Sequence, residues 1–311
     1  MNSKSNNKVL ILKLEENDIN GMLLNYDLDD NGKYQYMDDE FIDTVINYLP
    51  EYAMGHDNLP ISSMQLIPYL REAARSVIKI NRIDEIKHNL DEKISYQDWD
   101  KELLRIYNSK GIFSELILHF LLREFKNTLP LVSKVYFKDS YSHEAHGFDA
   151  VHISPDDKKL WLGETKFYNN GKKGIKELIN DLNNHFKHDY LKEQFLIISR
   201  AIVRNSPVRE EWIRKLTNAT RLEEKFDMMI IPLLCIYEDS VAKEFLNMVD
   251  DEISANKIYL QHISELQEYF HTNNIFRNKE RVQTLLMLLP VESKDRIVTG
   301  MLSKLYNLQN I

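Results

Sequence analysis

The stretch Gly147–Lys166, which reads GFDAVHISPDDKKLWLGETK, constrains the fold of this chain more than any other. Residues 148–153 and 160–166 are short apolar segments, and each carries charged side chains within the run. The intervening residues 154–157 (SPDD) have the composition of a turn. The pattern predicts two antiparallel strands joined by a hairpin-like connection.

The charged residues in these strands indicate a site. Side chains on a strand alternate between its two faces, so Glu164 and Lys166 project from the same face. If Asp149 pairs onto that face across the ladder, two carboxylates and one ammonium converge. Such charges are costly to bury unless they are paired or bind a metal. Mg²⁺ prefers carboxylate and water oxygens, so these residue types suit a divalent cation.

The order Asp149, then about fifteen residues, then Glu164-Thr165-Lys166 matches the PD-(D/E)XK nuclease pattern. Phe148 stands where the pattern's name has proline, a position that varies widely in this superfamily. A D…ExK pattern alone is short, and it also describes a surface hairpin with an ordinary Glu/Lys pair. The spacing by itself leaves both interpretations open.

A second acidic position precedes the motif. Residues 111–122 predict a helix that Ser114 can cap, and its run LILHFLL is apolar nearly all round, as in a buried helix. Glu115 at its start either stabilises the first turn through the helix dipole or is a third acid of the metal site. We predict the second role, because PD-(D/E)XK enzymes often place a Glu on the helix before the core sheet.

A candidate phosphate-binding segment follows the motif. A clean amphipathic helix is predicted there from the spacing of Ile175, Leu178, Ile179, Leu182 and Phe186. Backbone N–H groups at a helix N-terminus favour anions, and Lys172, Lys173 and Lys176 add positive charge. We predict that these lysines bind phosphate, the alternative being a solvated lysine cluster.

The remaining pattern predicts an α/β fold with a mixed sheet flanked by helices. Further strands are expected at residues 8–14, 131–138, 195–199 and 228–237, with Pro232 suggesting an edge position or a bulge. We predict an N-terminal α/β region packing on the core (1–100), a PD-(D/E)XK-like core (101–240) and a helical C-terminal extension (241–311).

Charge and composition limit the function. The formal net charge is -8, which is not that of a strong stand-alone nucleic-acid binder. A nuclease would need a local basic groove or a partner that supplies DNA affinity. The single cysteine, Cys235, excludes an internal disulfide framework and a multi-cysteine zinc site. No signal peptide or run of about 20 apolar residues is present, so we expect a cytoplasmic protein without membrane association.

With these elements placed, the chain resembles the HamA family, the nuclease-like subunits of the Hachiman anti-phage defence system. The likeness is strongest over residues 105–240 and weaker over 35–100. It is carried by the segments GIFSELILHFLLREF, SKVYFKDS, HGFDAVHI and LWLGETKFY. The resemblance implies a PD-(D/E)XK-like fold and a partner, the superfamily 2 helicase HamB. It further implies that the helicase senses foreign or damaged DNA and releases a DNA-degrading effector.

Residue by residue, Glu115 matches the family's helix acid, and Asp149, Glu164 and Lys166 match its D…ExK positions. We expect Mg²⁺ (or Mn²⁺) on Glu115, Asp149, Glu164 and the Thr165 carbonyl, in a deoxyribonuclease that a helicase restrains. The alternative is a non-catalytic binding or regulatory subunit of a helicase complex. RNA as substrate is a third possibility that the sequence does not discriminate.

Overall fold

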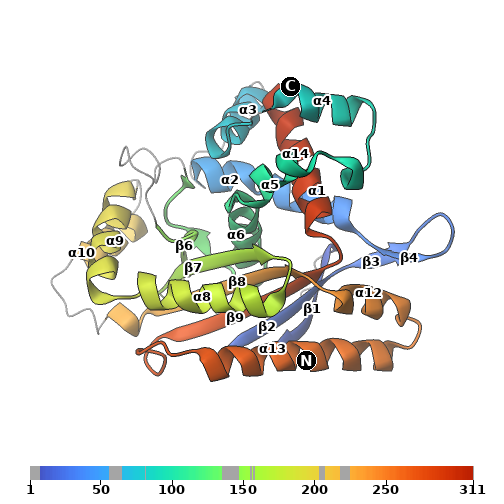
Figure 1. The fold of residues 1–311 in the computed structure, drawn as a ribbon. Helices are drawn as coiled ribbons and strands as arrows, with labels where there is room; N and C mark the ends of the chain where they lie inside the picture. The colour runs from blue at the N-terminus through green and yellow to red at the C-terminus, as the bar shows by residue number, and fades with distance from the viewer. Residues whose placement is uncertain are drawn as a thin grey trace.

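A computed structural model describes residues 8–55, 65–80, 82–134, 147–154, 156, 158–202, 207–217 and 225–310. Within these residues a seven-stranded mixed sheet has the order β1-β2-β9-β8-β7-β6-β5 (Figure 1). The bounds are β1 Leu10–Glu15, β2 Ile19–Leu24, β5 Leu129–Pro130, β6 Ala150–Ser154, β7 Lys159–Tyr168, β8 Met229–Glu238 and β9 Gln283–Val291. A separate hairpin pairs β3 (Tyr26–Leu28) antiparallel with β4 (Tyr34–Tyr36).

Helices cover both faces of the sheet. The neighbouring β7 residues Gly163 and Glu164 show this, because the first faces Leu118 of α6 and the second contacts His185 of α8. Figure 1 shows α8 and α13 along one face, and α6 with α1, α3, α5 and α14 beyond the other. The helices are α1 Asp38–Asn47, α2 Leu49–Met54, α3 Leu66–Val77, α4 Ile83–Asp91, α5 Lys101–Asn108, α6 Ile112–Lys126, α8 Gly171–His185, α9 His188–Ala201, α10 Pro207–Thr217, α12 Ser240–Asn247, α13 Glu252–Asn273 and α14 Lys294–Asn310.

The predicted α/β class and the predicted motif hairpin are confirmed. Strands β6 and β7 pair antiparallel with Ala150 opposite Gly163, a register that places Asp149 level with Glu164. Strand β8 lies on the other side of β7 and runs parallel to it. Cys235 of β8 is fully buried.

The C-terminal region is less purely helical than predicted. Helices α12, α13 and α14 are present, but residues 283–291 form β9, which lies between β2 and β8 with both of its pairings parallel. The expectation of a helix-only extension is wrong here, because a short apolar run fully buried in a sheet has no period that distinguishes it from helix. The sheet therefore takes strands from all three predicted regions, and the division into domains stays a prediction.

The edge position suggested by Pro232 is also wrong. Strand β8 lies between β7 and β9, and every residue except its last is buried. The pairing of β7 with β8 is interrupted between Trp161–Ile230 and Glu164–Leu233, the stretch that contains Pro232. A proline has no N–H for the ladder, so a central strand accommodates it by giving up pairing locally.

Two other strand predictions fail. Residues 195–199 belong to helix α9, where Leu191, Phe195 and Ile198 recur at helical spacing and are buried. In the segment 131–138, β5 ends at Pro130 and residues 131–134 are not strand. Residues 135–138 lie outside the described part of the chain.

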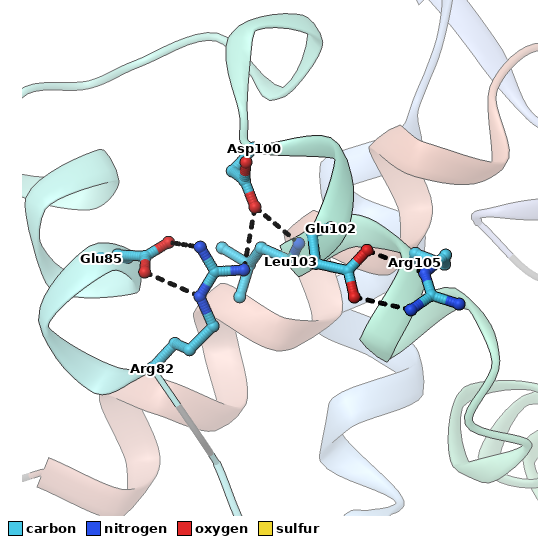
Figure 2. A network of polar contacts seen from close by, with 6 residues as sticks. All are labelled: Arg82, Glu85, Asp100, Glu102, Leu103 and Arg105. Atoms are coloured by element: carbon cyan, nitrogen blue, oxygen red, sulfur yellow. Dashed lines mark hydrogen bonds and ion pairs between the residues drawn. The ribbon is translucent and has the colours of Figure 1, made fainter.

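Surface ion pairs join the start of α4 to the start of α5 (Figure 2). The Arg82 guanidinium contacts Glu85 and also Asp100, the latter at 2.8 Å. The same Asp100 carboxylate caps α5 by accepting the Leu103 N–H at 2.9 Å. One carboxylate thus serves both a helix cap and an ion pair.

Close packing at Gly163 lets α6 lie against the motif strand. A Cβ at this position would come within 2.6 Å of Leu118 Cδ2, 3.2 Å of Ala150 Cβ and 3.3 Å of Pro232 Cγ. A larger residue directly before Glu164 would force the buried Leu118 side chain to shift.

We expect Gly163→Ala to lower the free energy of unfolding by about 1–3 kcal/mol, because the added methyl overpacks a buried contact. Urea denaturation of the variant measures the loss. In a Leu118→Ala background the same substitution should cost less, since the clashing side chain is gone. An equal cost in both backgrounds would contradict the packing explanation.

Candidate active site

The candidate site lies at the start of β6. There β7 extends past the last residue pair that the two strands share. The Asp149 N–H donates to the Gly163 carbonyl at 2.9 Å, which continues the ladder by one residue. The Asp149 carboxylate then accepts from the Thr165 N–H at 2.8 Å and from the Thr165 hydroxyl at 3.0 Å. A side chain thus takes the place of the next ladder bond, and the Asp149 carboxylate is held at the edge of β7.

A short chain of hydroxyl groups extends from Asp149 to α6. Thr165 Oγ1 lies 2.9 Å from Ser114 Oγ, which lies 2.9 Å from the Gly111 carbonyl oxygen. Two hydroxyl hydrogens must serve three contacts if Asp149 is ionised. A protonated Asp149 supplies the third hydrogen and satisfies every contact in the chain.

Ser114 is not the cap predicted for this helix. Helix α6 begins at Ile112 and its N-cap is Gly111, so Ser114 sits in the first turn and its hydroxyl contacts the Gly111 carbonyl. Its side chain is buried against Thr165 rather than exposed at the helix end. Ser114 therefore links α6 to the motif strand.

The negative charge of Glu115 raises the pKa of Asp149, but the Glu115 carboxylate itself is bound by other side chains. Its Oε2 accepts from the Tyr52 hydroxyl at 2.5 Å and forms an ion pair with Lys134. Glu115 is 8% exposed, so these partners compensate its burial. Sequence reasoning identified this acid but missed both partners, which come from α2 and from the segment after β5.

On the α8 face, each motif charge has a partner. Glu164 Oε1 lies 2.7 Å from His185 Nδ1, and Lys166 forms an ion pair with Asp181. The His185 ring stacks on Tyr190, with ring centroids 4.9 Å apart and an interplanar angle of 11°. The three charges predicted to converge are therefore present on one face, together with Asp181 and His185.

Sequence reasoning missed Asp181 and His185, although a signal exists. Gly174, Leu178, Asp181 and His185 are spaced by four, three and four residues, which places them on one face of α8. The first two members of this face are buried. Polar residues that continue a buried helical face need partners, and here the partners are Lys166 and Glu164.

Burial and like charges perturb the acids of the site. Burial raises the pKa of Asp149 well above its usual range, and the nearby Glu115 and Glu164 carboxylates raise it further. Burial also raises the pKa of Glu164, against the opposing effect of its hydrogen bond with His185. Without a further cation, this cluster holds protons more tightly than free carboxylates do.

Burial by itself lowers the pKa of the two basic groups of the site, but their acidic partners raise it. The hydrogen bond with Glu164 raises the pKa of His185, although burial opposes the shift. Burial alone would lower the pKa of Lys166, but its contact with Asp181 outweighs this, so the pKa of Lys166 is raised. Both groups are therefore stabilised in their charged forms.

The predicted phosphate-binding lysines lie at the other end of α8. Lys172, Lys173 and Lys176 are exposed near its N-terminus, where the Asn170 side chain accepts the Lys173 N–H at 3.0 Å. At about 1.5 Å per residue, Lys176 precedes Asp181 by about 7.5 Å and Lys172 by about 14 Å. The structure does not bring these lysines to the carboxylates, and their role stays a prediction.

The donor set for a metal is smaller than predicted. Among the described residues, no three His, Cys, Asp or Glu side chains converge closely enough to hold a metal ion. Asp149 and Glu164 lie level in the sheet, and the Thr165 carbonyl projects from the same strand edge as its N–H. These oxygen donors fit a hard divalent cation. Glu115, which Tyr52 and Lys134 engage, is the least available of the predicted ligands.

The fold defines a mixed α/β protein whose seven-stranded sheet is flanked by helices, and it brings Asp149 level with Glu164. A family model for HamA matches residues 3–305, and the chain belongs to the HamA family. The predicted resemblance is confirmed, and membership implies a component of the Hachiman antiviral defence system. No curated protein and no solved structure matches the chain.

No helix in the described part of the chain has both the length and the apolar character of a membrane span.

In the absence of divalent cations we expect Asp149→Asn to raise the free energy of unfolding by about 1 kcal/mol at pH 8. The raised pKa of Asp149 means that the folded state binds its proton more tightly than the unfolded state. Stability is therefore lost as pH rises from the unfolded pKa through the folded pKa. The amide cannot ionise, and it still accepts the Thr165 N–H.

Urea denaturation of wild type and Asp149→Asn at pH 5 and pH 8 tests this expectation. The advantage of the variant should be larger at pH 8, where more of the wild-type carboxylate is ionised. The opposite result would be a stability difference, variant minus wild type, that is lower at pH 8 than at pH 5. That result would show that the Asp149 charge stabilises the fold.

Proposed function

We propose that this chain is a metal-dependent deoxyribonuclease, the effector of an anti-phage defence system, which acts with and is restrained by the superfamily 2 helicase HamB. The observation that carries the proposal is the placement of Asp149 level with Glu164, with Lys166 two residues further along β7. Membership of the HamA family supports the defence role. The nuclease activity and the helicase partner go beyond that membership.

The proposed metal ligands are Asp149, Glu164 and the Thr165 carbonyl, with Glu115 contributing through its charge. Mg²⁺ is the expected ion, and Mn²⁺ suits the same oxygen donors. A bound divalent ion would lower the pKa of a water ligand and neutralise charge on the scissile phosphate. The raised pKa of Asp149 supports a cation here, because the cluster carries more negative charge than its surroundings compensate.

The other side chains position the reacting groups. Lys166 is proposed to orient the attacking water or to stabilise the charge that develops on the phosphate, and Asp181 fixes the place of its ammonium. His185, held by its stack on Tyr190, fixes the Glu164 carboxylate. Both are positioning residues on α8, and both act through a motif side chain.

A helicase partner would account for the negative net charge of a chain that acts on DNA. The chain carries a formal net charge of -8, which disfavours strong DNA binding by the chain alone. A helicase that binds DNA would bring the substrate to the site. It would also keep the nuclease from degrading DNA without a signal.

One observation favours the alternative of a non-catalytic binding or regulatory subunit. Glu164 and Lys166 are each already paired within the chain, with His185 and Asp181 respectively. A site whose charges are satisfied internally can persist for structural reasons alone. RNA in place of DNA is an alternative substrate for the catalytic proposal, and the same assay distinguishes it.

We expect Mg²⁺-dependent degradation of supercoiled plasmid by the chain, alone or together with its helicase. Glu164→Ala and Lys166→Ala should each reduce the rate at least a hundredfold, as the loss of a ligand or of a charge-stabilising group does. Lys257→Ala, at an exposed position on α13, is the matched control and should leave the rate unchanged.

Activity only with the helicase would support a restrained nuclease. Activity that survives both site variants would place catalysis elsewhere, and a chain inert in every combination on DNA and on RNA would favour the binding subunit.

Metal binding has a readout that does not need activity. We expect Mg²⁺ at about a hundred times its Kd to raise the melting temperature of the wild type by several degrees. Asp149→Asn should show no such rise, because it lacks a charged ligand. An equal rise in both proteins would mean that Mg²⁺ binds elsewhere.

A further inference from the structure

Lys134 brings a positive charge to two acids of the candidate site. Its ammonium forms an ion pair with the Glu115 carboxylate. Its charge also opposes the increase in the pKa of Asp149 that burial and the neighbouring carboxylates cause. One side chain therefore acts on both acids, and it comes from the segment after β5 rather than from the motif hairpin or α8.

Strand pairing brings the segment that carries Lys134 to the acids. Strand β5 pairs antiparallel with β6. The Leu131 N–H continues this pairing by donating to the Val151 carbonyl at 2.9 Å, so the segment runs toward Asp149 at the start of β6. Arg209 of α10 holds the same segment by donating to the Leu131 carbonyl at 2.7 Å. Both contacts fix the backbone that presents Lys134 to the acids.

A small cavity lies beside Asp149, and Tyr52, His119 and Lys134 contribute to its lining. Tyr52 and Lys134 are the groups that bind Glu115, and the Glu115 carboxylate is not among the described residues that line the cavity. The volume of about 30 Å³ holds about two water molecules. Mg²⁺ usually keeps several waters when a protein binds it. The space beside the acids is therefore too small for a hydrated Mg²⁺ ion while the Lys134 ammonium is in place.

The ammonium of Lys134 supplies the charge compensation that a metal ion would supply. The Glu115 side chain is 11% exposed and that of Lys134 is 24% exposed, so water screens their ion pair only in part. A buried carboxylate is costly unless an opposite charge or a metal compensates it. Lys134 and a divalent cation therefore compete for the same negative charge.

We propose that Lys134 is an internal counter-ion that competes with Mg²⁺ for the candidate site and keeps Glu115 out of the set of metal ligands. The proposal deepens the proposed function and rests on its metal site. Without a metal, Lys134 stabilises the acids. When its ammonium moves away, Glu115 becomes available as a third carboxylate ligand. The affinity for the metal is thus set by one lysine outside the motif.

The test measures the binding of Mg²⁺ and does not need activity. The Kd is obtained from the rise in melting temperature over a series of Mg²⁺ concentrations, for the wild type, Lys134→Met and Lys134→Arg. Lys134→Met should bind Mg²⁺ roughly tenfold more tightly, because the competing charge is gone. Lys134→Arg keeps the charge and should bind within about twofold of the wild type.

Two further variants separate this effect from a general loss of charge. Lys126 is the last residue of α6 and pairs with Glu15 at 3.0 Å, so Lys126→Met is the matched control and should leave the Kd unchanged. In a Glu115→Gln background, Lys134→Met should tighten binding by less than about threefold, because the carboxylate that Lys134 engages is absent.

Lys134→Met leaves Glu115 without its cation, so it should melt at a lower temperature than the wild type when no Mg²⁺ is present. If its unfolding is not cooperative, Lys134→Gln, which still donates a hydrogen bond, takes its place. An unchanged Kd in the variant without the charge, or equally tightened binding in Lys134→Arg, would overturn the proposal.

Failure of the inference and failure of the proposed function are distinguishable. If the wild type and Lys134→Met bind Mg²⁺ equally well, the metal site stands and the counter-ion does not. If only Lys134→Met binds Mg²⁺, the counter-ion is supported, and Lys134 blocks the site in the isolated chain. If neither protein binds Mg²⁺, the metal site of the proposed function fails, and the inference fails with it.

Discussion

The hydrogen bond from the Thr165 N–H to the Asp149 carboxylate is the contact on which the rest of this site depends. It forms because β6 begins one residue after Asp149, so a side chain takes over the ladder position that a backbone carbonyl would fill. The acid is thereby fixed level with Glu164 in a largely buried sheet. The neighbouring polar and charged groups offset the free-energy cost of burying carboxylates there.

That compensation comes from both layers of helices. On one side α8 brings Asp181 to Lys166 and His185 to Glu164. On the other side α6 brings Ser114 to Thr165, while Tyr52 and Lys134 hold Glu115. Burial and the neighbouring Glu115 and Glu164 carboxylates nevertheless raise the pKa of Asp149. A site of this kind is stable enough to persist and electrostatically suited to a cation.

The strand edge beside the site also contacts the C-terminal region. Strand β7 extends beyond its partner β6, and there Lys294 at the start of α14 donates to the Phe167 carbonyl at 2.6 Å. Helix α14 follows β9, the strand that completes the middle of the sheet. The C-terminal region is therefore part of the structure that shapes the site, although it lies far from the motif in sequence.

The sequence by itself determined the motif hairpin and the shared face of Glu164 and Lys166, because strand alternation is local. It also determined the buried helix that carries Glu115, because an apolar surface all round is visible in the residues. Only the tertiary structure decided that residues 283–291 are a central strand and residues 195–199 are helix, since burial removes the period that separates them. The partners Asp181, His185 and Lys134 likewise depend on which elements pack together, and no local pattern contains that information.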